Sequence, residues 1–167
     1  MPSTRYALTM PSSTDPATEP AELEADLPPF KTRLGDLLWA VTAYSELMGE
    51  AALAETPLTL PSSGMLESVL LEPGITVAEM SRRIPKTQQA ISQVAARLEK
   101  LGFLERRLGP GRGVGLYVTE TGREMAEEGS RRERELDARL RELLGQERHD
   151  QLRRLLIESR AILQAAR

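Results

Sequence analysis

The segment from Thr76 to Gly122 constrains the fold of this chain more than any other part of the sequence. It contains two short helical patterns separated by Pro85, and then two runs of strand-forming residues separated by a glycine-rich turn. Proline cannot continue a helix, because it lacks a backbone N–H and its ring clashes with the preceding turn. The segment therefore predicts a helix, a turn, a second helix and a hairpin, in that order.

Local signals set the ends of both helices. Thr76 and Glu79 have the T-x-x-E spacing of a capping box, in which each side chain satisfies a free backbone N–H. We expect this first helix to end near Ile84. The second helix is expected to begin around Thr87 and to end at Gly102, which can adopt the positive φ of a helix terminus.

The second helix has one apolar and one polar face. The apolar positions have the spacing of a buried stripe and are Ile91, Val94, Ala95, Leu98 and Leu101. The polar face consists of Gln89, Ser92, Gln93, Ala96 and Lys100, with Gln88 at its flank. Glutamine and serine can hydrogen-bond base edges in a major groove, where a small alanine permits close approach. A solvated polar face is the alternative, but the preceding turn and the following hairpin favour DNA.

The hairpin predicts a wing, which is a β-ribbon packed beside the helices. An isolated ribbon is marginally stable in water, so it needs the helix pair as a support. Arg112 lies at its glycine-rich tip, where a cation suits a phosphate or a narrow minor groove. A solvated tip is the alternative. These elements together form the sequence pattern of a winged helix-turn-helix.

This pattern resembles the MarR family of bacterial transcriptional regulators. The matching pieces are LTLPSSGML at 58–66, ITVAEMSRRI at 75–84, QQAISQVAARLEKLGFLERR at 88–107 and the run from Arg112 to Gly122. The general layout of the family covers about residues 32–165. The wing of the family usually carries D-x-R, whereas this chain has Pro110 at the Asp position and retains only Arg112.

The resemblance implies a mainly α fold with a small two- to three-stranded β-wing and dimerisation helices at both ends. Residues 1–29 are expected to form a disordered, Pro-rich tail. Residues 30–167 form the MarR-like domain. Within it we assign 32–56 and 120–167 to dimerisation helices, and 58–119 to the DNA-binding winged helix-turn-helix.

The helices outside the winged core carry apolar stripes that need a surface to cover. In the helix expected at 32–54, one face has Leu34, Leu37, Leu38, Val41, Tyr44, Ser45 and Met48, and the other has Trp39, Ala43 and Leu47. The helix expected at 147–165 should bury Leu152, Leu155, Leu156, Ile162 and Leu163. A homodimer interface built from both termini is the economical explanation. His149, beside the Gly145 junction, is expected to be solvated.

Charge is distributed unevenly along the chain. The whole chain has a formal net charge of −3, but Met80–Gly115 holds eight cations and two anions, a net charge of +6, so the remainder carries −9. A basic patch on an acidic body is typical of a nucleic-acid-binding protein. No apolar run approaches the roughly 20 residues of a membrane span, and no signal peptide is visible, so a cytoplasmic protein is expected.

Enzymatic chemistry has no support in this sequence. There is no cysteine and one histidine, and we find no nucleophile–base pair or metal-ligand spacing. The run GPGRGVG lies between two strands instead of opening a helix, so it is not a nucleotide-binding loop. No metal or cofactor is expected.

The sequence therefore predicts a repressor that binds double-stranded DNA as a homodimer on a pseudo-palindromic operator. Expected base contacts come from Gln88, Gln89 and Gln93, and expected phosphate or flank contacts from Lys86, Thr87 and Ser92, with Arg112 in the minor groove. The resemblance also implies a pocket for a small aromatic effector, with Trp39, Ala43, Leu47 and Met65 as candidate lining residues. The alternative is a small-molecule sensor or adaptor whose winged helix mediates protein contacts, and the +6 segment argues against it.

Overall fold

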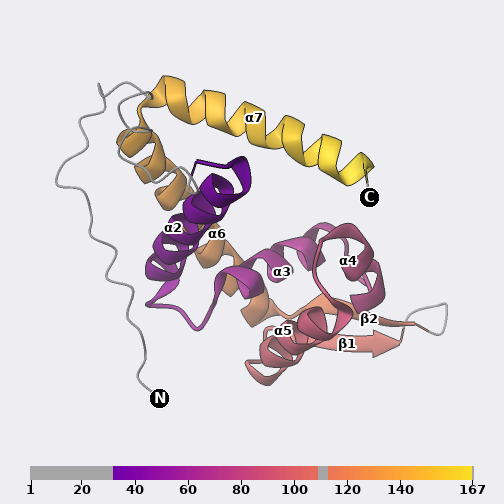
Figure 1. Cartoon of the computed structure of the whole chain (residues 1–167). Helices are drawn as coiled ribbons and strands as arrows, with labels where there is room; N and C mark the ends of the chain where they lie inside the picture. The colour runs from indigo at the N-terminus through magenta and orange to yellow at the C-terminus, as the bar shows by residue number, and fades with distance from the viewer. Residues whose placement is uncertain (1–31, 109–112, 167) are drawn as a thin grey trace, which may run out of the picture. The chain divides into compact units, whose positions relative to one another are not determined.

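The computed structural model describes residues 32–108 and 113–166, which fall into two compact units. One unit is Thr42–Arg139, and the other joins the described residues before Thr42 to those from Leu140 onward. The elements are α2 (Leu34–Leu53), α3 (Leu60–Leu71), α4 (Val77–Arg83), α5 (Gln88–Lys100), β1 (Leu104–Leu108), β2 (Val114–Val118), α6 (Glu120–Leu144) and α7 (Gln146–Ala165) (Figure 1). This confirms the mainly α fold with a small β-wing. The expected tail at 1–29 and the wing-tip Arg112 lie outside the described residues.

The apolar core of the Thr42–Arg139 unit lies among α3, α4, α5, the ribbon and the first half of α6. Its buried side chains are Leu53, Leu58, Met65, Leu66, Val69, Ile75, Val77, Met80, Ile91, Ala95, Leu98, Leu104, Leu116 and Ala126. The predicted stripe of α5 is largely confirmed, with Val94 half-buried. Leu101 is the exception at 39% exposure, because the helix ends at Lys100 and Leu101 is its C-cap.

The predicted capping box at the start of α4 is present. The Thr76 backbone N–H donates to Oε2 of Glu79 at 2.7 Å, and the Glu79 backbone N–H donates to Oγ1 of Thr76 at 3.2 Å. The bonds from Thr76 hold the pKa of the Glu79 carboxyl below its usual value, because they favour its charged form. The backbone N–H groups of Thr76 and Glu79 therefore both have hydrogen-bond acceptors at the start of α4.

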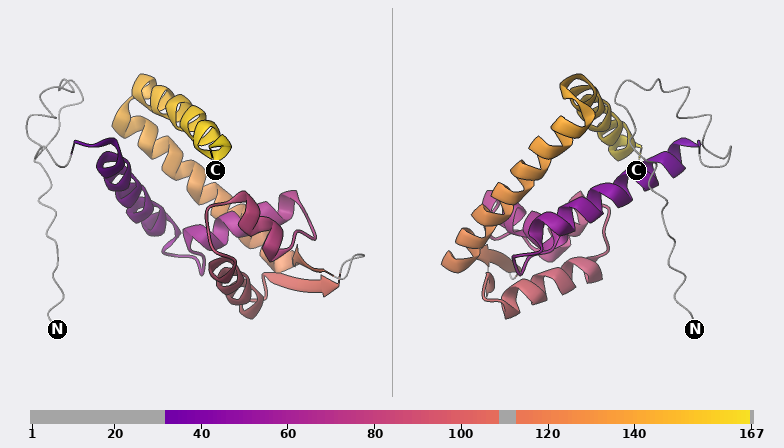
Figure 2. Two further views of the ribbon diagram at one scale, coloured as in Figure 1. Left: turned by 45° about the vertical axis from the view of Figure 1, so that its right-hand side comes forward. Right: turned by 90° about the vertical axis from the view of Figure 1, so that its left-hand side faces the viewer.

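The wing is an antiparallel pair of strands in which Leu104 faces Val118 and Leu108 faces Val114. Backbone hydrogen bonds also connect Leu116 of β2 to the segment before α4, at 2.8 Å to Gly74 and 3.0 Å to Ile75. The sheet in the described residues has two strands, in agreement with the expected two- to three-stranded wing. The two further views in Figure 2 show α5 and the ribbon as neighbours, in agreement with the contacts between α5 and β1.

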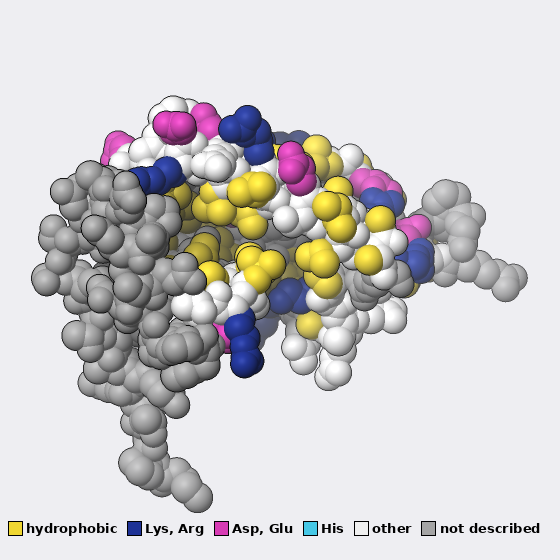
Figure 3. Space-filling model, turned by 45° about the horizontal axis from the view of Figure 1, so that its top comes forward, with side chains coloured by type: hydrophobic (Ala, Val, Ile, Leu, Met, Phe, Trp, Pro, Cys, Tyr) yellow, Lys and Arg dark blue, Asp and Glu magenta, His cyan; other side chains and the backbone are white. Residues whose placement is uncertain are grey.

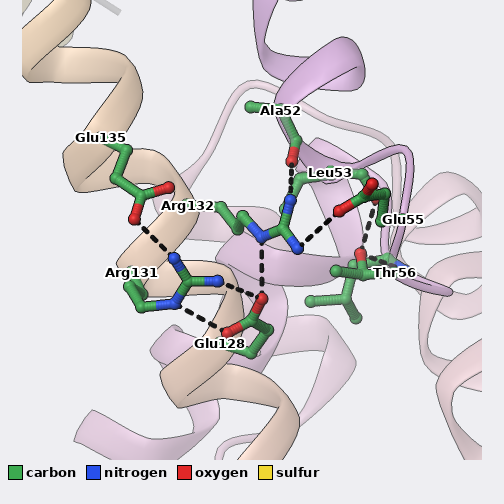
Figure 4. A network of polar contacts seen from close by, with 9 residues as sticks. Ala52, Leu53, Glu55, Thr56, Glu128, Arg131, Arg132 and Glu135 are labelled. Carbon is green, nitrogen blue, oxygen red and sulfur yellow. Dashed lines mark hydrogen bonds and ion pairs between the residues drawn. The ribbon is translucent and has the colours of Figure 1, made fainter.

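A polar network ties α6 to the end of α2 within this unit (Figure 4). Arg132 donates through Nε to Glu128 at 2.7 Å, through Nη2 to Glu55 at 3.0 Å and through Nη1 to the Ala52 carbonyl at 3.4 Å. Arg131 donates to Glu128 as well, and the two guanidinium groups lower the pKa of Glu128 to about 2. Arg132 therefore attaches α6 both to the last turn of α2 and to the first residues of the loop that follows it.

Ser63 on α3 provides a test of how tightly this unit is packed. Its side chain is fully buried, and its Oγ has no hydrogen-bond partner among the described residues. Gly129 of α6 approaches it so closely that a Cβ at Gly129 would lie 2.7 Å from this Oγ. Burying a hydroxyl without a hydrogen-bond partner costs stability.

We expect Ser63→Ala to leave the free energy of unfolding unchanged or to raise it by about 1 kcal/mol, because the variant removes an unsatisfied polar atom. The neighbouring Ser62→Ala is the control. Ser62 Oγ donates to the Thr59 carbonyl at 2.9 Å and accepts from the Thr59 N–H at 2.7 Å, so this variant should lose about 1 kcal/mol. Urea unfolding measures both, and equal destabilisation of the two variants would contradict this account.

The second unit, which joins the described residues before Thr42 to those from Leu140 onward, leaves its apolar stripes exposed. The predicted burial of Leu152, Leu155, Leu156, Ile162 and Leu163 on α7 is wrong for the single chain, where they are 37–69% exposed. Leu34, Leu37, Leu38 and Val41 of α2 are exposed as well, and Figure 3 shows hydrophobic side chains at the surface. Within the described residues, these stripes remain uncovered.

His149 also differs from its prediction. It is only 6% exposed instead of solvated, and its Nδ1 lies 3.1 Å from Oδ1 of Asp150. His149 lies in the first turn of α7, which begins one residue after Gly145. Separately, none of the helices in the described ranges has the length and apolar character that a membrane span requires.

Candidate nucleic-acid interface

The turn between α4 and α5 sets the position of α5. The Lys86 N–H donates to the Ile84 carbonyl at 2.8 Å, which closes the turn around Pro85. Thr87 is the N-cap of α5, and its Oγ1 accepts from the Ala90 N–H at 3.2 Å. With the inner stripe of α5 anchored in the core, the outer face of this helix has one defined orientation.

Most of the predicted DNA-contacting residues gather at the start of that outer face. Gln88, Gln89 and Gln93 are exposed, and so are Lys86 and Thr87 in the preceding turn. Ser92 is half-buried, so it is the least accessible member of the set. The described residues thus bring together six of the seven candidates, and Arg112 is the seventh, outside them.

Ion pairs engage several cations of the basic segment. Arg83 pairs with Glu72, Arg106 with Glu99 at 2.9 Å, and Arg107 with Glu105. Arg97 donates to the Pro57 carbonyl at 3.1 Å. Among the described cations of this segment, Arg82, Lys86 and Lys100 form neither an ion pair nor a side-chain hydrogen bond with other described residues.

The three unpaired cations flank the amide face of α5. Lys86 precedes the helix, Lys100 is its last residue, and Arg82 lies in the last turn of α4. Cations in such positions can contact phosphates while the amides between them reach base edges. Arg82 was missing from the predicted contacts, although its sequence position, four residues before Lys86, could have indicated it.

A cavity of about 750 Å³ lies behind the same turn, within the Thr42–Arg139 unit. Its lining residues are Glu46, Glu50, Leu60, Pro61, Gly64, Met65, Ser68, Met80, Ile84, Lys86, Ala90, Ile91 and Val94. Roughly 300–1,000 Å³ is the usual size of a small-molecule pocket. The cavity therefore has room for a small organic ligand, and one of its walls is the start of α5.

Of the four predicted pocket residues, Met65 lines this cavity. Ala43 and Leu47 do not line it, and Leu47 is 67% exposed. Trp39 belongs to the other unit and is 70% exposed. Sequence reasoning missed Glu46 and Glu50, although they follow Ala43 by three and seven residues and so share its helix face.

The described residues contain no group of three or more histidine, aspartate or glutamate side chains that could hold a metal ion. The polar groups of the α5 region are instead amides, hydroxyls and unpaired cations on an exposed helix. This arrangement is suited to recognising a polyanion through hydrogen bonds and charge.

Comparison with known proteins points to one family. The sequence model described as "MarR family" matches residues 56–113. The structure of Mycobacterium tuberculosis MarR family protein Rv2887 in complex with salicylic acid is 32% identical, with a TM-score of 0.62 over 80% of this chain and 98% of that one. Rv2887 in complex with DNA is 29% identical, with a TM-score of 0.63 over 76% of this chain and 97% of that one.

A more distant structure supports the same fold. The PcaV transcriptional regulator of Streptomyces coelicolor, in complex with its natural ligand, has a TM-score of 0.71 at 21% identity, over 84% of this chain and 99% of that one. A comparison with curated protein sequences gives no match.

Proposed function

This chain belongs to the MarR family, and we propose that it represses transcription by binding double-stranded DNA as a sequence-specific homodimer. The observation that carries this proposal is the exposed amide face of α5, Gln88, Gln89 and Gln93, flanked by the unpaired Arg82, Lys86 and Lys100. The DNA complex of Rv2887, which is 29% identical, supports the same use of this fold.

In this proposal α5 enters the major groove. A glutamine side chain can pair with adenine in a bidentate manner, because its Nε2 donates to N7 and its Oε1 accepts from the N6 amino group. Gln89 and Gln93 therefore supply sequence discrimination. Lys86 and Arg82 hold the helix on the backbone by contacting phosphates, which adds affinity for any sequence. Thr87 and Ser92 contact the flank, and Arg112 reaches the minor groove.

The exposed apolar stripes support the homodimer. Leu155 and Ile162 on α7 are 53% and 69% exposed in the single chain, and they lie seven residues apart on one helix face. In a twofold interface the same stripe of both chains would be buried. Two α5 helices related by such an axis read a pseudo-palindrome with half-sites roughly 10 bp apart.

The cavity supports regulation by a small aromatic effector that releases the operator. Lys86, Ala90, Ile91 and Val94 line it from the α4–α5 turn and the first half of α5. A ligand that binds more tightly when α5 occupies a position unsuited to DNA lowers the affinity for DNA. DNA then lowers the affinity for the ligand by the same coupling free energy. Of the residues expected to line an effector pocket, Met65 is part of this cavity.

We expect Gln89→Ala to lose about 1–3 kcal/mol of binding free energy on the preferred operator and little on scrambled DNA, because it removes a base contact. Arg82→Ala should weaken binding to both DNAs. It should also reduce the slope of log affinity against log salt concentration by about one, because one phosphate contact is lost. Gln151→Ala, an exposed glutamine of α7, is the matched control. The measurement is fluorescence anisotropy with an operator selected from a random pool.

Two results would contradict the proposal. If selection from the random pool yields no preferred sequence, the exposed winged helix serves a different purpose, such as protein contact. If Gln89→Ala and Arg82→Ala weaken specific and scrambled DNA equally, the roles assigned to the amide and the guanidinium are wrong.

A further inference from the structure

The cavity beside α5 has an acidic edge formed by α2. Glu46 and Glu50 are four residues apart on this helix, so they lie one turn apart on the same face, and both line the cavity. Both side chains belong to exposed residues, which places their charges where the cavity meets solvent. A ligand that enters would therefore pass two carboxylates.

Neither carboxylate is neutralised by an ion pair with another described residue. Glu50 accepts a hydrogen bond from the Leu60 N–H at 3.2 Å through Oε1, which leaves Oε2 available. Lys86 is the one cation among the lining residues, and it forms no ion pair with Glu46 or Glu50. The charged residues that line the cavity thus carry a net charge of −1.

Apart from Ser68, the rest of the cavity lining is apolar. Met65, Met80 and Ile91 are buried, and Leu60 and Val94 are half-buried around them. Methionine side chains are flexible and polarisable, so they adapt to planar or irregular apolar groups. An apolar wall with two carboxylates at its edge is complementary to a hydrocarbon or aromatic body that carries a positive charge.

We propose that this cavity binds an apolar organic cation, whose ammonium or amidinium group lies between Glu46 and Glu50. An aromatic carboxylate of the same size would face two like charges and one opposite charge, which disfavours it. The ligand class is thus opposite in charge to the salicylic acid bound by Rv2887. The regulatory meaning of this ligand rests on the proposed function, whereas its binding can be measured without DNA.

The test uses two probes of similar size and opposite charge, anthracenylmethylammonium and anthracenecarboxylate. Isothermal titration of the full chain at neutral pH and low salt should show tighter binding of the ammonium probe by about tenfold or more, from two charge contacts. The double variant Glu46→Gln with Glu50→Gln should remove most of that preference. Glutamine at position 50 keeps an oxygen that can accept the Leu60 N–H.

The control is the double variant Glu124→Gln with Glu127→Gln, which changes the net charge equally at two exposed positions of α6 outside the cavity. It should retain the preference for the ammonium probe. Circular dichroism verifies that all variants are folded. Tighter binding of the carboxylate, equal binding of both probes, no binding of either, or an equal loss in the control would overturn the proposal.

The same preparations separate this inference from the proposed function. Specific DNA binding by the unmodified chain is measured in parallel by anisotropy. Failure to bind any operator would overturn the proposed function while leaving the probe result intact. Operator binding together with failure of the ammonium probe would overturn only the cationic ligand.

Discussion

Gly122→Ala is expected to destabilise the winged unit by about 3 kcal/mol or more, because the added methyl group has no room. A Cβ at Gly122 would lie 2.0 Å from the Phe103 carbonyl oxygen and 2.9 Å from Cγ1 of Val118. The first of these contacts is with backbone, so no side-chain rotation relieves it. The Phe103 carbonyl also accepts from the Thr119 N–H at 3.1 Å, and shifting it would break that bond.

The surrounding hydrogen bonds make this position rigid. Thr119 Oγ1 donates to the Gly102 carbonyl at 2.6 Å and accepts from the Gly122 N–H at 3.0 Å. The start of α6 is therefore attached to the segment where α5 ends and β1 begins. A loss of about 3 kcal/mol is a large part of the roughly 5–15 kcal/mol that stabilises an ordinary domain.

Urea unfolding followed by circular dichroism measures this effect. Gly64→Ala is the matched control, since a Cβ there meets nothing within 4 Å and the residue lies inside α3. It should stabilise the helix by about 0.5–1 kcal/mol. Similar unfolding midpoints for Gly122→Ala and Gly64→Ala would show that α6 can move away from Phe103 without cost.

The double variant Leu155→Glu with Ile162→Glu is expected to convert the proposed homodimer into monomers. Twofold symmetry would place four new charges in the interface, and each buried leucine or isoleucine contributes about 1.5–3 kcal/mol through its apolar surface. Affinity for a palindromic operator should fall about 100-fold or more, because one protomer then engages one half-site.

Sedimentation velocity and anisotropy test this expectation together. Leu71→Glu is the control, because Leu71 is 88% exposed at the end of α3, away from the terminal helices in sequence. It should leave both the sedimentation coefficient and operator affinity unchanged. A dimer that survives the double variant would mean that the exposed stripe of α7 has another purpose.

Local sequence signals predicted the elements of this chain well. The capping box at Thr76 and Glu79, the break at Pro85 and the positive φ of 76° at Gly102 all lie where the sequence placed them. The helix expected at 147–165 is likewise present as α7, Gln146–Ala165. Such features depend on residues a few positions apart, so the order of the chain is enough to reveal them.

The face of α5 was also predictable from the sequence. Periodicity identified Ile91, Ala95 and Leu98 as the buried side, which leaves Gln89 and Gln93 on the outside. Helix geometry alone relates these two faces. The family could be identified from the same segment, since its motifs are continuous in sequence.

Contacts between residues far apart in the sequence required the tertiary structure. Arg132 reaches Glu55, and Ser63 packs against Gly129, through pairings that no local spacing indicates. The difference between paired Arg106 and unpaired Lys100 likewise depends on where β1 places its side chains relative to α5.

The cavity also depends on residues that are far apart in the sequence. Its wall combines Glu46 and Glu50 with Met65, Met80 and Lys86, which come from separate elements and share no sequence pattern. The sequence by itself determined the helices, the wing, the amide face and the family, because each depends on short-range spacing. Only the tertiary structure decided which charges stay unpaired and which side chains enclose a cavity, because both depend on how distant segments pack against one another.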